Sequence, residues 1–266
     1  MAQPGSSGSM PAVLQKFLVT SKTVVVTGGA RGLGFEFAKG LAQAGANIAA
    51  IDRDDIAPPY FDQLSQAGGR HKYYKSDVTD YKGLKATINQ ISQDFGSING
   101  CIPAAGIIRD RPFLQHSTQD LEDTMDVNVN GVFYTMQLCC AKMVEQGQGG
   151  SIVCIASTAG HRSLFPQTIT AYTASKYAVR GLVKQVAAEM AQHKIRVNSI
   201  SPGVIKTDML ESVMQAEPTR RALFEGSNVM GRLGTADELV GMVLCLMSDA
   251  SPFTTGQDFL VDGGQI

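Results

Sequence analysis

The chain has 266 residues, 23 of them Lys or Arg and 24 of them Asp or Glu, and its formal net charge is -1. This balance excludes the basic surface with which proteins bind nucleic acid or an anionic membrane, so the expected partner is a small-molecule substrate. No apolar run approaches the roughly 20 residues that cross a bilayer, and no basic-then-apolar signal opens the chain. We therefore expect a cytoplasmic protein.

The first residues differ in composition from the rest of the chain. The opening MAQPGSSGSMPA is rich in Gly, Ser and Pro and has no hydrophobic period. We therefore expect residues 1–20 to be a disordered leader or an expression remnant. Residues 21–266 are expected to form one domain, because α/β chains of this length often share a single large core.

Helix and strand patterns alternate from Lys22 to the C-terminus. Apolar residues recur at spacings of three and four in 32–45, 81–95 and 179–193, as on one face of a helix. Short β-branched runs predict strands at 22–27, 47–52, 71–77, 98–104, 151–157, 195–202 and 257–264. This alternation predicts the α/β class: a single doubly wound Rossmann-type domain with a central parallel sheet and helices on both faces. No strand is predicted over about 206–234, which we expect to form a helical lid.

The first predicted strand runs into TGGARGLG, a turn that opens a helix. Gly28, Gly32 and Gly34 permit a tight turn and a close approach of the backbone to a pyrophosphate, and the helix N-terminus adds N–H donors. Glycines alone also occur at ordinary strand-to-helix turns. Here a strand precedes them, a helix follows, and an acidic residue lies about 20 positions further on, as dinucleotide binding requires.

That acidic residue is Asp52, which closes the second predicted strand. Its carboxylate can accept hydrogen bonds from the adenosine ribose and would repel a 2′-phosphate, so NAD(H) is favoured. Arg31 and Arg53 keep NADP(H) possible, since either guanidinium could bind a 2′-phosphate, although both could equally be solvated loop residues.

The five cysteines contain no Cys-x-x-Cys pair and lie mostly in apolar segments. We expect buried free thiols and predict neither a disulfide nor a metal site.

Residues 171–180 read AYTASKYAVR, which places Tyr172 and Lys176 one helical turn apart on a common face. A phenol has a pKa near 10, and a nearby ammonium is the simplest way to lower it. Taken alone, the pair could equally be a half-buried Tyr and a surface Lys of an ordinary amphipathic helix.

Seven short motifs occur in a fixed order: TGGARGLG, SDV, AAG, VNVNG, IVCIAS, YTASK and SPGVIKT. Together they resemble the short-chain dehydrogenase/reductase family over essentially the whole chain from about Lys22. One segment departs from that pattern, because PAAG at 103–106 stands where the family usually has Asn-Asn-Ala-Gly. Proline cannot donate its backbone N–H, so we expect a locally different brace for the central strand.

The resemblance implies a role for each catalytic candidate. Tyr172 would act as general acid or base on the substrate oxygen while hydride moves to or from nicotinamide. Lys176 would lower the pKa of that phenol and hold the nicotinamide ribose. Ser157 would hydrogen-bond the substrate carbonyl, and Asn128 would hold a water in the proton relay. The predicted cofactor contacts are Gly28, Arg31, Gly32, Leu33, Gly34, Asp52, Arg53, Asp77, Val78, Ala105, Gly106, Tyr172, Lys176, Pro202, Gly203, Ile205 and Thr207.

Three segments are expected to shape the substrate pocket: 107–113, 161–170 and the lid. Apolar lid residues fit either an adaptable cover or simple core packing, and they are Met209, Leu210, Met214, Phe224 and Met230. His161 and Arg162 could contact a polar or anionic group of a substrate, although loop residues of these types are usually solvated.

The implied activity is oxidation of a secondary alcohol or reduction of a ketone. The whole pattern is similar to fungal polyol and ketose reductases, such as sorbose reductase and arabinitol dehydrogenase relatives, but a ketone of secondary metabolism also suits the apolar pocket. Two alternatives are an imine or activated-alkene reductase and a non-catalytic dinucleotide sensor, which would not need the four catalytic candidates together. The resemblance further implies a homo-tetramer or homo-dimer packed through long helices.

Overall fold

The computed structural model describes residues 10–207, 210–211, 214–215 and 219–266. Within these residues, seven parallel strands form one sheet in the order β3-β2-β1-β4-β5-β6-β7. Every strand coincides with a predicted one, which confirms the Rossmann-type α/β fold. The strands are β1 (Thr23–Thr27), β2 (Asn47–Asp52), β3 (His71–Lys75), β4 (Gly100–Pro103), β5 (Gly150–Ile155), β6 (Ile195–Pro202) and β7 (Asp258–Val261).

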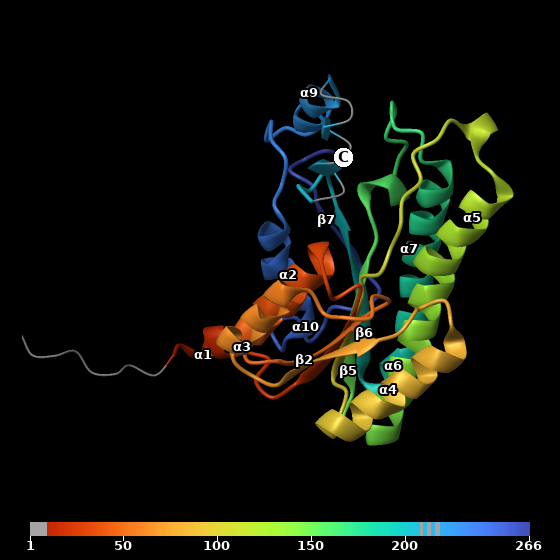
Figure 1. Cartoon of the computed structure of the whole chain (residues 1–266). Coiled ribbons are helices and arrows are strands. Elements are labelled where there is room, and N and C mark those ends of the chain that lie inside the picture. The colour runs from red at the N-terminus through yellow and green to blue at the C-terminus, as the bar shows by residue number, and fades with distance from the viewer. Residues whose placement is uncertain (1–9, 208–209, 212–213, 216–218) are drawn as a thin grey trace, which may run out of the picture.

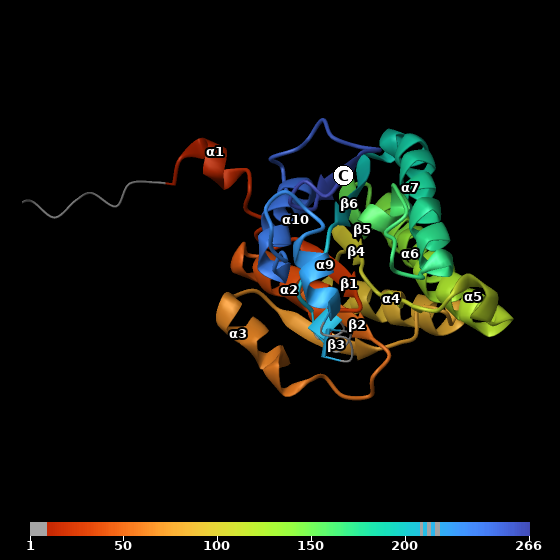
Figure 2. The same ribbon diagram turned by 90° about the horizontal axis from the view of Figure 1, so that it is seen from above.

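Helices cover both faces of the sheet (Figures 1 and 2). One face carries α2 (Gly32–Gln43), α3 (Gln63–Ala67) and α10 (Val240–Met247), and the other carries α4 (Tyr81–Phe95), α6 (Gly131–Gln146) and α7 (Thr170–Met190). No helix in the described part of the chain is long and apolar enough to span a bilayer. The remaining α-helices are α1 (Ala12–Gln15), α5 (Thr118–Met125) and α9 (Thr219–Glu225).

Local signals fix where the helices begin and end. Asp80 caps α4 by accepting a hydrogen bond from the backbone N–H of Lys82, and the helix stops at Gly96 with φ +83°. Ser117 and Asp120 form a reciprocal capping box at the start of α5. These caps orient the segments that return the chain to the sheet.

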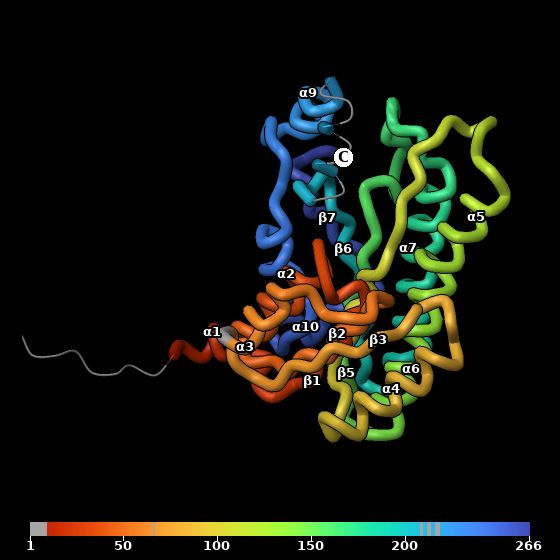
Figure 3. Tube along the Cα trace, viewed as in Figure 1, coloured from red at the N-terminus to blue at the C-terminus, as the bar shows by residue number. Residues whose placement is uncertain are grey.

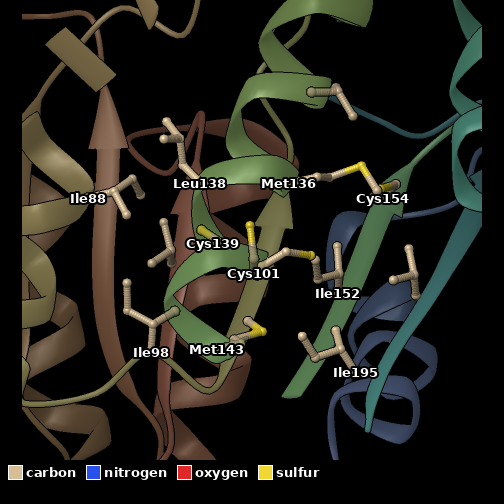
Figure 4. Packing of buried hydrophobic residues seen from close by; sticks show 14 of the residues in the cluster. Ile88, Ile98, Cys101, Met136, Leu138, Cys139, Met143, Ile152, Cys154 and Ile195 are labelled. Carbon is tan, nitrogen blue, oxygen red and sulfur yellow. The ribbon is translucent and has the colours of Figure 1, made fainter. Parts of the chain in front are cut away.

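The core consists of two apolar layers, one on each face of the sheet. Figure 4 shows part of the layer under α4 and α6, where Cys101 of β4 lies beside Cys139 of α6 and Met136 of α6 contacts Cys154 of β5. Each large side chain buried in this way stabilises the fold by about 1.5–3 kcal/mol. All five cysteines are free thiols, and four of them are buried.

Adjacent strands β1 and β4 mark the point where the chain reverses its direction across the sheet. In doubly wound folds the crevice for a ligand opens at this point, beyond the carboxyl ends of the strands. The backbone there is braced by Thr27, whose carbonyl oxygen accepts from Ala104 N at 3.1 Å and whose Oγ1 accepts from Ala105 N at 3.5 Å. Thr27 thus holds the backbone of the PAAG segment.

The expected boundary at residue 20 differs from the structure. Residues 1–9 lie outside the described part of the chain, but α1 forms at 12–15. Val19 is fully buried, and its N–H donates to Ala44 O at 3.0 Å. Because Val19 packs in the core, the folded part of the chain begins before residue 21.

The segment predicted as a lid is partly helical. In it, α9 lies above the sheet on the same side as the C-terminus (Figure 3). The lid segment and the C-terminal residues are joined by a hydrogen bond in which Met230 N donates to Gly263 O at 3.2 Å. Met209 lies outside the described residues.

Candidate active site

A cavity of about 700 Å³ opens at the carboxyl ends of the central strands. It collects residues that are distant in sequence, from the first glycine turn to the segment after β6. Every predicted site residue except Asn128 lines it: Gly28, Arg31, Gly32, Leu33, Gly34, Asp52, Arg53, Asp77, Val78, Ala105, Gly106, Ser157, Tyr172, Lys176, Pro202, Gly203, Ile205 and Thr207.

The glycine turn needs its glycines for separate reasons. Gly28 has φ +66°, and a Cβ there would lie 2.8 Å from the backbone of Ala105. A Cβ on Gly34 would collide with the carbonyl oxygen of Gly28. Gly32 has φ +57° with open space beside it, so the N-terminus of α2 faces the cavity without a side chain in between. Such an open helix N-terminus favours a phosphate group.

Asp52 stands at the end of β2 with its carboxylate fixed by two backbone donors. Its Oδ2 accepts from Ala30 N at 3.1 Å, and its Oδ1 accepts from Arg53 N at 2.9 Å. A carboxylate has about four acceptor sites, so both oxygens can still accept ribose hydroxyls.

The two nearby arginines are arranged differently. Arg31 forms an ion pair of 3.3 Å with Asp54. The Arg53 side chain has no ion pair or hydrogen bond to any residue that the structure describes.

Further along the cavity, the Asp77 side chain stabilises a turn, because its Oδ1 accepts hydrogen bonds from both N and Oγ1 of Thr79. Val78 is buried against Gly131. Together with the glycine turn and Asp52, these residues fit the phosphates, ribose and adenine of a dinucleotide.

Tyr172 and Lys176 occupy one face of α7, as their spacing predicted. The Lys176 side chain is only 5% exposed, and its Nζ lies 5.3 Å from the centre of the Tyr172 ring. That ammonium donates a hydrogen bond of 2.8 Å to Ile155 O. Burial lowers the pKa of Lys176 to about 8, because removal from water disfavours the charged form.

The expected lowering of the Tyr172 pKa by Lys176 is wrong for this structure. Burial raises the pKa of Tyr172, and a hydrogen bond with Ser157 acts in the opposite direction without reversing the shift. The phenol is thus neutral at pH 7 and can act as a proton donor.

Ser157 joins this pair from the end of β5. It caps the short 3₁₀ turn Thr158–Gly160, with its Oγ accepting from Ala159 N at 3.1 Å. The strand-end capping role and the contact with Tyr172 therefore coexist in one side chain.

Asn128 lies behind the cavity, fully buried in the π-helical turn Asp126–Asn130. Its side-chain amide makes two hydrogen bonds to the backbone of Ile107: Oδ1 accepts from Ile107 N at 2.8 Å, and Nδ2 donates to Ile107 O at 2.9 Å. It also donates to Ser175 Oγ at 3.0 Å. Asn128 thus links the strand-end segment after Gly106 to the helix that carries Tyr172.

The far end of the cavity is built by the segment after β6. Gly203 is required there because a Cβ would lie 2.7 Å from Asp262 Cα. Ile205 makes a bridge to Gly234, and Thr207 Oγ1 accepts from Leu210 N at 3.3 Å. This places the predicted nicotinamide-binding segment beside the lid.

A second cavity of about 280 Å³ adjoins the first and shares Leu164, Gln167 and Val204 with it. Of the lid residues singled out from the sequence, Leu210 lines the first cavity and Phe224 the second. Met214 is buried outside both, and Met230 is exposed.

His161 and Arg162, which the sequence paired, have different surroundings. Arg162 lines the second cavity, whereas His161 Nε2 pairs with Asp258 at 2.7 Å and lines neither cavity.

Two polar clusters were not anticipated from the sequence. Asp110 accepts from Thr168 N and Oγ1 and pairs with Arg220 at 2.6 Å, joining three segments around the cavities. Asp258 pairs with His161 and Arg180 behind α7. Of these residues, only Arg180 could have been singled out from the sequence, because it lies four residues after Lys176 on the same helical face.

No group of three His, Cys, Asp or Glu side chains within the described residues is arranged for a metal ion.

Comparisons with known proteins agree with this geometry. A family model described as enoyl-(acyl carrier protein) reductase matches residues 28–265. The chain is 35% identical over 257 residues to the NADP-dependent mannitol dehydrogenase of Hypocrea jecorina, covering 95% of each chain. It is 35% identical over 252 residues to sorbose reductase of Schizosaccharomyces pombe, with 93% of this chain and 97% of that one covered. These relatives confirm the expected similarity to fungal polyol and ketose reductases.

Among solved structures, a short-chain type dehydrogenase/reductase from Mycobacterium marinum matches with a TM-score of 0.91 and 36% identity. The match covers 96% of this chain and 99% of that one. The likeness therefore extends over the sheet, both helical layers and the site.

Proposed function

The chain belongs to the short-chain dehydrogenase/reductase family, and from that premise we propose that it interconverts a secondary alcohol and a ketone, with Tyr172 exchanging the substrate proton. The enzyme uses a nicotinamide dinucleotide. The observation that carries the proposal is the convergence of Ser157, Tyr172 and Lys176 on one wall of the large cavity. A protein that only sensed a dinucleotide would not need this set.

The bound cofactor supplies or accepts the hydride. In reduction, the Ser157 hydroxyl holds the ketone oxygen, and the Tyr172 hydroxyl gives its proton to that oxygen as the hydride arrives at carbon. Lys176, whose Nζ lies 5.3 Å from the centre of the Tyr172 ring, is the cation placed to stabilise the phenolate that remains. In oxidation the same phenolate accepts the proton.

Asn128 acts in this scheme by position. Its hydrogen bonds to Ile107 and to Ser175 hold the cavity-lining segment after Gly106 against α7. Gly106 borders the space between Asn128 and Lys176, since a Cβ there would be in ordinary contact with Asn128 Oδ1 at 3.4 Å and Lys176 Nζ at 4.0 Å. That space suits the water of the proton relay.

The adenosine end supports NAD(H) as the favoured cofactor and leaves NADP(H) possible. Asp52 presents a carboxylate fixed for ribose hydroxyls, whereas Arg53 presents a guanidinium for a 2′-phosphate. The similarity to an NADP-dependent mannitol dehydrogenase weighs on the side of NADP(H).

Substrates of the polyol and ketose class are proposed from the two named relatives, a mannitol dehydrogenase and a sorbose reductase. The large cavity that Tyr172 lines mixes apolar walls with polar groups, among them Ile108, Ile169, Asp110 and Gln167. The second candidate is reduction of an activated alkene, favoured by the description of the matching family model. The same Tyr172 and Lys176 could donate the proton there.

Assembly as a homo-tetramer or homo-dimer in the cytoplasm belongs to the same proposal. Several large apolar side chains are exposed on α5, α6 and α7, which supports packing of a second copy against these helices, and they are Leu121, Phe133, Val144 and Tyr177. Light scattering on the purified protein measures the oligomeric state.

Titration with NADH and NADPH in parallel, followed by turnover assays on ketoses, apolar ketones and activated alkenes, tests the function. Oxidation of the bound cofactor by one ketone class supports the proposal and assigns the cofactor. Turnover of alkenes alone favours the second candidate, and no binding of either cofactor contradicts both.

A further inference from the structure

The second cavity lies where the far end of a substrate would extend. It is bounded by the loop after Ser157 and by α9, and it shares Leu164, Gln167 and Val204 with the large cavity that Tyr172 lines. A molecule held with its reacting carbon at Tyr172 can therefore reach both spaces. The glycine turn and Asp52 line the large cavity and not the second one.

The charged side chains that line the second cavity are all cationic. Arg162 and Arg220 line it, and no acidic residue in the described chain does so. Arg220 is already paired with Asp110 at 2.6 Å. Arg162 is exposed, and its side chain has no hydrogen bond or ion pair with any described residue, so its guanidinium is available to an anionic partner in this cavity. An anion entering this cavity would gain a charged partner, whereas a cation would meet none.

Asp110 does not cancel this preference. Its pKa is lowered: burial opposes the charged form, but hydrogen bonds from Thr168 and the contact with Arg220 outweigh it. The carboxylate therefore stays ionised with its charge met by Arg220. The remaining walls are partly apolar, including Leu164 and Phe224, and can pack against a carbon chain.

We propose that the second cavity is a subsite for a carboxylate at the far end of the substrate, bound by Arg162, so that the enzyme prefers hydroxy or keto acids to their neutral analogues. This inference rests on the proposed function and narrows its substrate class. Arg162 acts as a specificity determinant and takes no part in proton or hydride transfer. A planar guanidinium suits this role because it can bind both carboxylate oxygens.

Matched substrate pairs test the subsite directly. 5-Keto-D-gluconate and L-sorbose differ only in whether one end is a carboxylate or a hydroxymethyl group, and D-gluconate and D-glucitol form the corresponding pair for oxidation. Further acid and polyol pairs of four and five carbons complete the panel. The expected ratio of kcat/KM, acid over neutral, exceeds about tenfold, as for one well-placed charged hydrogen bond.

Variants assign the preference to its residue. Arg162→Gln should reduce the acid-to-neutral ratio about tenfold by raising KM for the acid, and Arg162→Lys should restore part of it. Arg221→Gln is the matched control, because Arg221 is a neighbouring arginine that pairs with Glu211 and Glu225 and lines neither cavity. It should leave the ratio unchanged. An equal ratio in wild type and Arg162→Gln overturns the subsite, as does Tyr172-dependent turnover confined to neutral ketones.

Binding separates failure of the subsite from failure of the proposed function. Calorimetry with the protein saturated by its cofactor compares D-gluconate with D-glucitol. Tighter binding of D-gluconate that is lost in Arg162→Gln supports the subsite even if no ketone in the panel is reduced. Equal binding of the two compounds overturns it even if reductase activity is found.

Discussion

Lys176 Nζ donates a hydrogen bond of 2.8 Å to the carbonyl oxygen of Ile155, the last residue of β5. This bond ties the helix that carries Tyr172 to the strand that leads directly to Ser157. The structure thus holds the three side chains of the proposed chemistry together, at the cost of burying an ammonium.

That buried ammonium makes stability depend on pH. Burial lowers the pKa of Lys176 from 10.5 to about 8. Below pH 8 both folded and unfolded chains hold the proton, so the folded state bears the full cost. Between pH 8 and 10.5 the unfolded chain holds more protons, so the free energy of unfolding rises with pH. The rise corresponds to about 3 kcal/mol.

Urea unfolding of wild type and Lys176→Met at pH 7.5 and pH 10 measures this effect. The wild type should gain roughly 2–3 kcal/mol relative to the variant between these pH values. Lys85→Met, at an exposed lysine of α4, controls for the loss of a lysine. A pH-independent difference between wild type and Lys176→Met would show that the ammonium is not buried as described.

Asp258 should be among the residues most sensitive to loss of charge. Its side chain is 9% exposed and accepts from Ser199 Oγ at 2.5 Å and from Ser201 Oγ at 2.8 Å, besides pairing with His161 and Arg180. Asp258→Asn should destabilise the fold by about 3 kcal/mol, since it leaves a partly buried Arg180 without its carboxylate.

The matched control is Asp249→Asn, because Asp249 pairs with Lys22 but its side chain is 74% exposed. That change should cost under about 1 kcal/mol. Comparable losses of stability in the two variants would mean that the Asp258 cluster does not behave as a buried network.

Asp52 should set the choice between the two cofactors. Asp52→Ala removes the carboxylate held by Ala30 N and Arg53 N, so the ratio of Kd for NADPH to Kd for NADH should fall about tenfold or more. Arg53→Ala should shift the ratio the other way, since it removes the unpaired guanidinium. Fluorescence titration measures both, and an unaltered ratio in Asp52→Ala would show that this carboxylate does not contact the ribose.

Two helical glycines should respond oppositely to the same substitution. Gly34→Ala should lower the free energy of unfolding by more than about 2 kcal/mol and weaken cofactor binding, because its Cβ collides with Gly28 O. Gly181→Ala, in α7 with nothing within 4 Å of a Cβ, should stabilise the fold by up to about 1 kcal/mol. Thermal unfolding ranks the two variants, and a stable Gly34→Ala enzyme would mean that the turn relaxes readily.

The strands and the first turn could be predicted because their signals are local. A β-branched run such as Val24–Val26 and the positive φ that Gly28 and Gly32 adopt follow from chain chemistry without knowledge of the partner segment. The placement of Tyr172 and Lys176 on one face follows equally from helical spacing.

The features that could not be predicted from the sequence depend on contacts between segments that are distant along the chain. Asp258 meets His161 across 97 positions, and Asp110 meets Arg220 across 110. Nothing in the residues near Tyr172 showed that burial would raise its pKa, because burial is set by the whole fold. The start of the folded region was placed too late for the same reason, since Val19 is buried by residues from other elements.

Comparison of wild type with Tyr172→Phe tests the central claim most directly. The substitution removes one hydroxyl from α7, so cofactor affinity by fluorescence titration and the unfolding temperature should both stay close to wild type. With the best ketone substrate, kcat should fall by at least about 10²-fold, the usual contribution of a general acid. A variant that binds cofactor and keeps wild-type turnover would contradict the assignment of Tyr172 as the proton donor.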